Sequence, residues 1–291
     1  MTPADLDFVA ALVRAHAGVV IRADKAFFIE TRLGPVARRE KVPGVPALLE
    51  KLRQTPDPVL TRQVVEATLM QETSFFRDRA VFERIGKVLL PELAARRPDG
   101  RLRVLCAGCA TGQEAYSIAM LATDLAAPAS VEIVAVDFGQ FPLEKARTGL
   151  YTHFEVQRGL PIRRLLAHFD KIDENWRIRA DLRQMVQWVE LNLLDDLTGL
   201  GTFDLVLCRN VLGSLTPEAQ TRVLASLEAA CRPDAVLVVG AQETPALSAA
   251  FSLAGSPGLW QRSPTVAPEP ASVPAPVPSS ASTPVPARTQ A

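Results

Sequence analysis

From residue 101 onward, short apolar runs alternate with segments that have the pattern of amphipathic helices. Short apolar runs bounded by turns are typical of strands that are buried on both faces. A strand–helix–strand rhythm of this kind predicts a parallel sheet with helices on both faces, and therefore an α/β fold. The predicted strands are RLRVLC (101–106), VEIVAVD (131–137), FDLVLC (203–208) and AVLVVG (235–240), and the predicted helices are residues 112–125, 143–149 and 217–230.

The first 80 residues have a different pattern. They contain no convincing strand, and Thr2 followed by Pro3 is a typical helix start that Gly18 can end. Beyond Gly18, several prolines divide this region into short segments. We therefore expect a helical N-terminal domain at 1–80 and a sheet domain at 81–263.

Two further segments interrupt this organisation. Between residues 151 and 190, RGLPIRRLLAHF predicts a helix and WRIRADLRQMVQWVEL suggests two short strands, so we expect an inserted subdomain with a helix and a β-hairpin. The last segment, 264–291, consists mainly of proline, alanine, serine and valine. Such a composition cannot form a packed core, and we expect a disordered tail or linker there.

Charge and composition exclude several classes of function. Lysine plus arginine equals aspartate plus glutamate at 32 each, so no overall field attracts the chain to nucleic acid. No apolar run approaches the roughly 20 residues that insert into a membrane, and the N-terminal segment has two acids where a secretory signal would be basic. The four cysteines are too few for a disulfide framework. We expect a cytoplasmic protein, and we expect it to act as a monomer.

The turn between the first predicted strand and its helix, RVLCAGCATGQEAYSIAM at 103–120, is the candidate ligand site. Such a turn places backbone amides at the carboxyl edge of the sheet, where α/β proteins bind ligands. It lacks the three-glycine fingerprint of dinucleotide sites and the lysine of a phosphate loop. Cys106 and Cys109 have no histidine nearby, so we expect no metal site. The alternative interpretation is that small residues only pack where a strand meets a helix.

Two acids accompany this turn. Glu114 falls in the first turn of the helix, and Asp137 ends the next strand. An acid at the end of the second strand of such a fold accepts hydrogen bonds from ribose hydroxyls. An acid beside the turn would repel phosphates but attract an ammonium group, which favours S-adenosylmethionine (SAM) over a pyrophosphate carrier.

Several segments resemble, in the same order, the signatures of the CheR-type chemoreceptor glutamate methyltransferases. The resemblance extends from the N-terminal helices to about Arg262 and leaves out only the tail. The segments are QETSFFRD (71–78), CAGCATGQEAYSIAM (106–120), AVDFGQFPLEKARTGLY (135–151), WVELNLL (188–194) and FDLVLCRNVL (203–212).

The resemblance implies a SAM-dependent enzyme with a Rossmann-like domain that esterifies glutamate side chains of a chemoreceptor helical bundle and releases S-adenosylhomocysteine (SAH). It places Glu114 at the ammonium of the cofactor, Asp137 at the ribose and Arg77 near the methyl group. It places Asn192 and Leu193 at the adenine. The full set of implied cofactor residues is Gln71, Thr73, Arg77, Gly108, Glu114, Asp137, Asn192, Leu193, Arg209 and Asn210.

The chain also departs from the family pattern. The most consequential difference is Ser214, which stands where the family has a tyrosine, so the implied catalytic residues are Arg77 and Ser214. Loss of the tyrosine predicts slower turnover rather than complete inactivity. The alternative is a catalytically weak or inactive CheR-like scaffold that binds SAM or SAH in a chemosensory complex. The other departures are Gln71, Gln113, Ala115, Gly139, Ala241 and Gln242.

A chemoreceptor bundle is acidic, so its methyltransferase needs a local basic surface. The segment ETRLGPVARREK supplies one on or near a single predicted helix, and in the family this part of the N-terminal domain helps to dock the substrate. The alternative is an ordinary solvated helix face. A small-molecule substrate is disfavoured because the basic domain and the insertion leave an open, protein-sized approach. The expected docking residues are Arg32, Arg38, Arg39 and Lys41.

Overall fold

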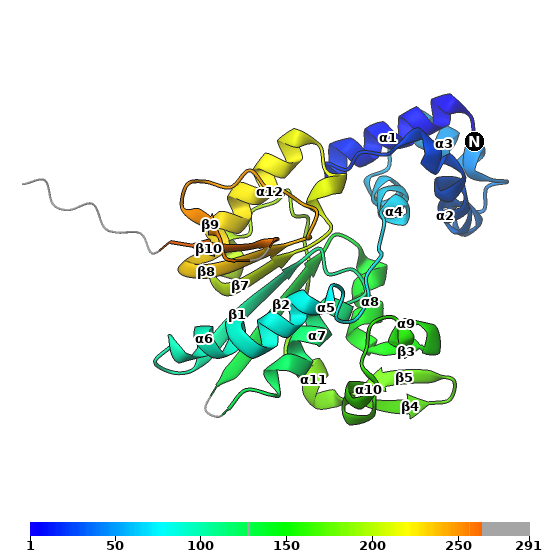
Figure 1. The fold of residues 1–291 in the computed structure, drawn as a ribbon. Coiled ribbons are helices and arrows are strands. Elements are labelled where there is room, and N and C mark those ends of the chain that lie inside the picture. Colours follow the sequence, from blue (N-terminus) through cyan, green and yellow to red (C-terminus); the bar gives the residue numbers. More distant parts are fainter. Residues whose placement is uncertain (127–128, 256, 264–291) are drawn as a thin grey trace, which may run out of the picture.

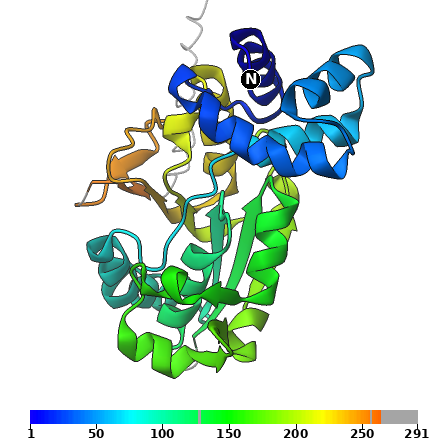
Figure 2. The same ribbon diagram turned by 90° about the vertical axis from the view of Figure 1, so that its right-hand side faces the viewer.

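The computed structural model describes residues 1–126, 129–255 and 257–263, and the expected tail at 264–291 lies outside the described residues. N-terminal helices lie over one end of a twisted α/β sheet, and a small second sheet projects on the same side of the molecule (Figure 1). Figure 2, seen from that side, shows the N-terminal helices and the small sheet with the main sheet between them. This arrangement confirms the predicted α/β class with added helices at the N-terminus.

The N-terminal helices pack around a core of their own. The first is α1 (Pro3–Ala17), which begins with a capping box between Thr2 and Asp5 and ends at Gly18, as predicted. Gly18 has a φ of 66°, and a Cβ there would lie 2.5 Å from the side chain of Ala219, so this close approach requires glycine. The other elements are η1 (Ala23–Lys25), α2 (Ala26–Arg39), α3 (Val45–Gln54) and α4 (Pro58–Thr68).

The main sheet has seven strands in the order β6-β2-β1-β7-β8-β10-β9. The first five run parallel. At one edge, β10 pairs antiparallel with β8, and β9 pairs antiparallel with β10. The order changes direction at β1, so the turn after β1 lies where α/β sheets bind ligands. The strands are β1 (Arg101–Ala107), β2 (Ser130–Asp137), β6 (Val186–Glu190), β7 (Phe203–Cys208), β8 (Cys231–Val239), β9 (Phe251–Leu253) and β10 (Leu259–Arg262).

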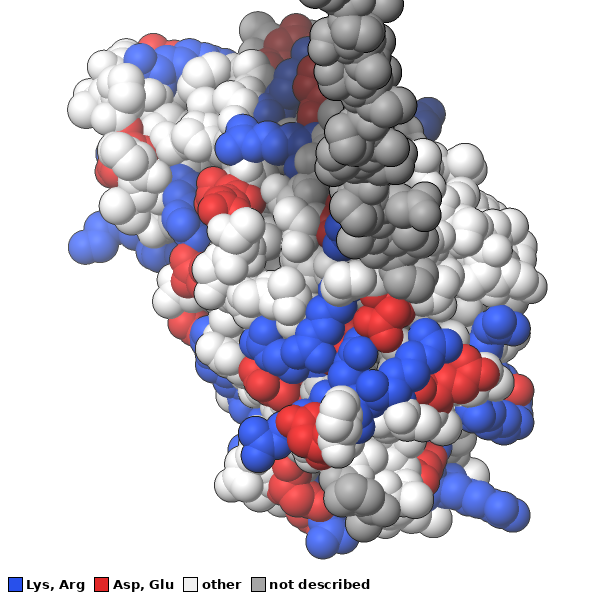
Figure 3. All heavy atoms as spheres, turned by 90° about the vertical axis from the view of Figure 1, so that its left-hand side faces the viewer, with Lys and Arg blue, Asp and Glu red and all other residues white. Residues whose placement is uncertain are grey.

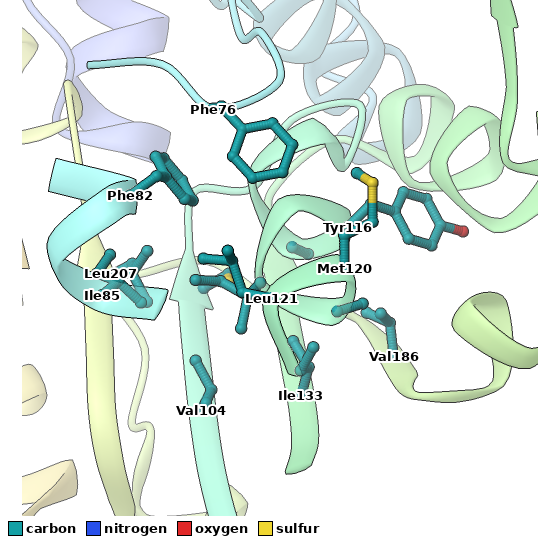
Figure 4. Close-up of a cluster of buried hydrophobic side chains, with 14 of the residues drawn as sticks. Phe76, Phe82, Ile85, Val104, Tyr116, Met120, Leu121, Ile133, Val186 and Leu207 are labelled. Atoms are coloured by element: carbon teal, nitrogen blue, oxygen red, sulfur yellow. The ribbon is translucent and has the colours of Figure 1, made fainter. Parts of the chain in front are cut away.

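Both faces of the sheet are buried. Alternate residues of each strand point to opposite sides and pack into two different hydrophobic clusters. Val104 and Cys106 of β1 belong to one hydrophobic cluster, and Leu105 and Ala107 belong to the other. Figure 4 shows part of the first cluster, in which Tyr116 and Met120 of the next helix lie beside each other. The helices on the first face are α5 (Arg79–Arg84), the π-helical turn η2 (Ile85–Leu89), α6 (Leu90–Ala95), α7 (Gln113–Ala122) and α8 (Gln140–Thr148). Those on the second are η3 (Thr198–Leu200), η4 (Leu212–Ser214) and α12 (Pro217–Ala230).

The inserted segment differs from the prediction in its strands. Its hairpin joins β4 (Phe169–Ile172) to β5 (Asn175–Ile178), and β3 (Leu150–Thr152) completes a three-stranded antiparallel sheet. Residues 186–190 were expected within the insertion, and this expectation is wrong: they form β6, which pairs with β2 at the edge of the main sheet. The physical reason is that Val186 and Trp188 pack against the main core. The helices of this region are α9 (His153–Gln157), α10 (Ile162–His168) and α11 (Ala180–Gln184).

An ion-pair network connects the turn after α6 to the amino-terminal side of the sheet. Asp204 of β7 is fully buried, and its carboxylate accepts hydrogen bonds from Arg97, from Arg232 at 3.1 Å and from the Arg103 backbone at 2.7 Å. Arg97 also pairs with Asp234 at 2.7 Å. On the face that includes α6, basic side chains gather with acidic ones between them (Figure 3).

Replacing Arg97 with methionine is expected to lower the free energy of unfolding by about 2–3 kcal/mol, because it leaves a buried carboxylate short of a charged partner. Denaturant unfolding followed by circular dichroism measures this change. Arg101→Met is the matched control, since the Arg101 side chain is 78% exposed and its distance to Asp99 is 3.9 Å. Equal stability of the two variants would show that the network contributes little.

Among the described residues, no helix combines the length and the apolar character needed to cross a bilayer.

Candidate active site

The candidate site is a cavity of about 430 Å³ between the N-terminal helices and the carboxyl edge of the main sheet. Ala17 and residues 19–22 and 68–72 line it on the helical side. On the sheet side the lining comes from the turns that follow β1, β2, β6 and β7. Eight of the predicted site residues line this cavity, and they are Gln71, Gly108, Asp137, Asn192, Leu193, Arg209, Asn210 and Ser214.

The backbone around the cavity contains several residues in a sparsely populated conformation. Phe76, Asp78, Ala110 and Asn210 have φ values between 47° and 62°, although none is glycine. Non-glycine residues in this region cost free energy and persist only where surrounding contacts hold them. Such residues cluster at functional sites, and here they gather in the three chain segments that meet at the cavity.

Asp137 lies at the end of β2, as predicted. Its carboxylate accepts hydrogen bonds from the backbone N–H groups of Ala110 at 2.7 Å and Gly139 at 2.9 Å. Burial raises the pKa of Asp137, and these backbone hydrogen bonds oppose that effect. The side chain therefore braces the turn after β1 and has further oxygen lone pairs for ligand hydroxyls.

Glu114 does not line either cavity, but it belongs to a charge cluster with Arg209, which lines the main one. Its carboxylate accepts a hydrogen bond from Arg209 at 2.7 Å, and the same guanidinium pairs with Asp78. Burial raises the pKa of Glu114, and the charge of Arg209 opposes that effect. Asp78 follows Arg77 directly in the sequence, but its salt bridge is to Arg209. Two acids therefore share the guanidinium of Arg209.

The segment at 69–78 crosses from α4 to α5 and carries three of the predicted residues. It is anchored by Phe75, which is fully buried and packs edge-to-face on Tyr151, and by the Phe76 N–H, which donates to the Ser117 hydroxyl at 3.0 Å. Residues 70–72 line the main cavity and also a second cavity of about 420 Å³. Thr73 lines only the second cavity.

Arg77 lies outside the lining of both cavities. Its guanidinium donates to the Glu72 carbonyl at 3.3 Å, and the side chain is partly exposed. Its charge lowers the pKa of Glu114, though less than the charge of Arg209 does. Arg77 is therefore near the charge cluster, on the segment that separates the two cavities.

Asn192 connects the two parts of the molecule. Its side-chain amide donates to the carbonyl of His16 at the end of α1 at 2.6 Å and accepts from the Leu194 N–H at 3.1 Å. Leu193 packs against the second hydrophobic cluster of the sheet. A short backbone bridge between Val19 and Leu215 closes the same side of the cavity.

Ser214 lies in the short helix η4 and is exposed. Its hydroxyl donates to the Val211 carbonyl at 2.7 Å, and its own carbonyl accepts from the Val20 N–H at 2.8 Å. The side chain thus turns back on its own loop, although the residue lines the cavity.

The expected docking residues do not all face one way. Arg32 lies over the Phe28 ring and lines the second cavity, and Arg39 lies over the Phe141 ring of α8. Arg38 and Lys41 are exposed at the end of α2. Arg39 therefore contributes to packing between the helices and the sheet domain as well as to surface charge.

Comparison with known proteins identifies the family. A model described as "CheR methyltransferase, SAM binding domain" matches residues 71–257. The chain belongs to the CheR methyltransferase family. The Chemotaxis protein methyltransferase Cher2 of Pseudomonas putida is 30% identical over 84% of this chain and 92% of its own length. Chemotaxis protein methyltransferase 1 of Pseudomonas aeruginosa is 32% identical over 82% of this chain and 90% of its own length. The probable biofilm formation methyltransferase WspC of the same organism is 30% identical over 68% of this chain and 47% of its own length.

The cavity residues of this CheR-type, SAM-dependent methyltransferase fit the cofactor. At Gly108, with a φ of 73°, a Cβ would lie 2.6 Å from the Val211 side chain, so the turn leaves no room for a larger residue. The Nε of Arg209 is buried and has no hydrogen-bond partner among the described residues. The outer nitrogens of this guanidinium are bonded to Glu114 and Asp78. Asp137 lines the cavity and offers carboxylate oxygens as acceptors, whereas Glu114 is bonded to Arg209 and lies outside the lining.

Three parts of the site were missed by the sequence predictions. Residues 19–22, which line the cavity, were assigned only to a docking domain. Asp78 was not expected to pair with Arg209, although it lies in the QETSFFRD motif. Glu243 accepts hydrogen bonds from the loop after β7. Its place directly after Ala241 and Gln242, where the chain departs from the family pattern, is the signal that could have drawn attention to it.

Proposed function

We propose that the chain transfers the methyl group of SAM to glutamate side chains of a chemoreceptor or similar signalling helical bundle and forms glutamyl methyl esters. The observation that carries this proposal is the position of segment 70–72, which separates the cofactor cavity from a second cavity that opens toward α2 and α9. Arg32 and Arg158 line this second cavity from the two sides. A glutamate on a partner helix would meet the Arg32 guanidinium there, close to the segment that carries Arg77, whereas Arg158 is paired with Glu72 at 2.9 Å.

The chemistry needs little from the protein beyond alignment. SAM, when bound, supplies a methyl carbon attached to a positively charged sulfur. A glutamate carboxylate has an ordinary pKa near 4.3 and is already an anion at neutral pH, so no general base is needed. The carboxylate oxygen forms a bond to the methyl carbon as the carbon–sulfur bond breaks, and the electron pair stays on sulfur. In this proposal, Arg77 orients the carboxylate by a charge-assisted hydrogen bond, and the surrounding residues exclude water.

An alternative is a scaffold that binds SAM or SAH without turnover. The observation that favours it is Ser214, which stands at the position of the family tyrosine and whose hydroxyl is bonded to its own loop. A tyrosine at this position would reach farther into the cavity and could help to align the substrate. Its absence affects positioning rather than any proton transfer.

Replacing Ser214 with tyrosine is expected to raise kcat by about tenfold, because it adds an orienting contact at the edge of the cavity. Ser214→Ala is the matched control and should leave kcat within about twofold, since the serine hydroxyl bonds only within its loop. Initial rates of methyl transfer at saturating SAM measure both. If Ser214→Tyr is no faster than wild type, the positioning argument is wrong.

Surface charge on α2 is proposed to attract the acidic substrate. Arg38→Glu is expected to raise the KM for a receptor fragment several-fold at low salt and to reduce its salt dependence, because exposed charges mainly steer association. Arg39 is left unchanged, since it packs on Phe141. Arg222→Glu, an exposed charge reversal on α12, is the control. An equal change in both variants would show that α2 is an ordinary solvated face.

The substrate class is tested by mass spectrometry of chemoreceptor cytoplasmic fragments incubated with the protein and SAM. The proposal expects the mass of one methyl group on particular glutamates and its removal by mild base, because methyl esters hydrolyse readily. Methylation only of lysine or of small molecules would contradict it. A cytoplasmic location and a monomeric state belong to the same proposal.

A further inference from the structure

Glu243 connects the loop that follows β7 to the turn that follows β8. Its carboxylate accepts hydrogen bonds from three backbone N–H groups, those of Asn210 at 2.9 Å, Gly213 at 3.0 Å and Gly240 at 2.7 Å. The Glu243 N–H in turn donates to the Gly240 carbonyl at 2.9 Å. One side chain therefore holds two chain segments that are about 30 residues apart in the sequence.

The loop held by Glu243, residues 209–214, carries several of the groups that face the cofactor cavity. It contains Arg209, Asn210 and Ser214, which all line the cavity. Asn210 has a φ of 60°, a conformation that a residue with a side chain adopts only when its surroundings hold it there. The hydrogen bond from its N–H to the Glu243 carboxylate is charge-assisted, and such bonds are stronger than those between neutral groups.

The turn at Gly240 is shaped to bring the carboxylate close. A Cβ at Gly240 would lie 2.7 Å from a carboxylate oxygen of Glu243 and 3.0 Å from the side-chain amide of Asn210. Glycine at 240 is therefore required for the close approach of these two side chains. Both carboxylate oxygens face backbone N–H groups, so the carboxylate is arranged to fix a loop.

We propose that Glu243 is a positioning residue for methyl transfer, which fixes the loop at 209–214 and thereby the orientation of Asn210 and Ser214 toward the cavity. This inference rests on the proposed function only in that the loop borders the site of transfer. It makes a separate claim about cofactor affinity, which needs no receptor. Without the Glu243 carboxylate, Asn210 would relax toward an ordinary backbone conformation, and the side chains of the loop would no longer keep their orientation toward the cavity.

The test compares Glu243→Gln and Glu243→Ala with wild type by calorimetric titration of SAH and by thermal unfolding of the unliganded protein. Glutamine keeps one acceptor oxygen and alanine keeps none, so SAH affinity is expected to fall about tenfold for glutamine and further for alanine. The control is Glu228→Gln, because the Glu228 carboxylate also accepts from a backbone N–H, that of Ser248 at 2.9 Å, but lies outside the cavity lining. SAH affinity of this control should equal that of wild type.

Amide hydrogen exchange keeps the test decisive if an alanine variant folds poorly or if no receptor is methylated. In Glu243→Gln, the amides of residues 210 and 213 are expected to exchange faster while those of β7 keep their protection. Wild-type exchange at 210 and 213, or unchanged SAH affinity in both Glu243 variants, would overturn the inference. An affinity loss of the same size in Glu228→Gln would also overturn it, since it would indicate general destabilisation.

Discussion

Replacing Asp137 with alanine is expected to weaken SAH and SAM binding by about 100-fold or more. Hydrogen bonds to a charged group contribute about 1.5–3 kcal/mol each, and a ribose offers two hydroxyls to this carboxylate. The same substitution removes the carboxylate that accepts from the Ala110 and Gly139 N–H groups, so the turn after β1 loses these two hydrogen bonds. Isothermal titration calorimetry of the folded variant measures the loss.

The matched control for this substitution is Asp196→Ala. The Asp196 carboxylate also accepts from the N–H two residues ahead, that of Thr198 at 2.8 Å, but it is exposed and lies outside the cavity lining. Its loss should leave SAH affinity unchanged. Asp137→Asn, which keeps one acceptor oxygen, should be intermediate. Wild-type SAH affinity in Asp137→Ala would show that the ribose does not bind at this edge of the sheet.

Replacing Arg77 with alanine is expected to lower kcat by about 100-fold while SAH affinity changes less than tenfold. The reason is that orientation of the incoming carboxylate by a bidentate cation acts on the transfer step, whereas the proposed cofactor site is the main cavity, whose lining does not include Arg77. Initial rates at saturating SAM, together with calorimetric SAH affinities, separate the two effects.

Two variants test whether the effect belongs to the Arg77 guanidinium. Arg79→Ala removes an arginine two residues away whose side chain is 86% exposed and pairs with Glu83, so kcat should not change. Arg77→Lys keeps the charge but loses the planar pair of donors and should recover part of the rate. A loss of SAH affinity as large as the loss of kcat would show that Arg77 mainly binds the cofactor.

Much of the fold could be predicted because its signals are local. The apolar runs that became β1, β2, β7 and β8 are each continuous in the sequence, and the helix predicted at 217–230 has the bounds of α12. Thr2 and Gly18 marked the ends of α1 because capping depends on neighbouring residues. The positions of Glu114 and Asp137 followed from the same local pattern, since each is fixed by the element it adjoins.

The features that the sequence did not reveal depend on contacts between distant residues. The strands at 186–190 and 175–178 are both short and both lie in the segment that we expected to be an insertion. Only the packing of the first against β2 decides that it joins the main sheet. The pairing of Arg209 with Asp78 joins residues 131 positions apart. The short strands β9 and β10 contain three and four residues, too few to show a clear period.

A single-turnover reaction tests the proposed methyl transfer to glutamate most directly. The protein is in excess over methyl-labelled SAM, and a chemoreceptor cytoplasmic fragment is present. An active glutamate methyltransferase is expected to move the label to the receptor fragment in a base-labile form and to leave an equal amount of SAH. Label that stays in bound SAM with every receptor fragment offered would contradict the account and would identify the chain as a cofactor-binding scaffold.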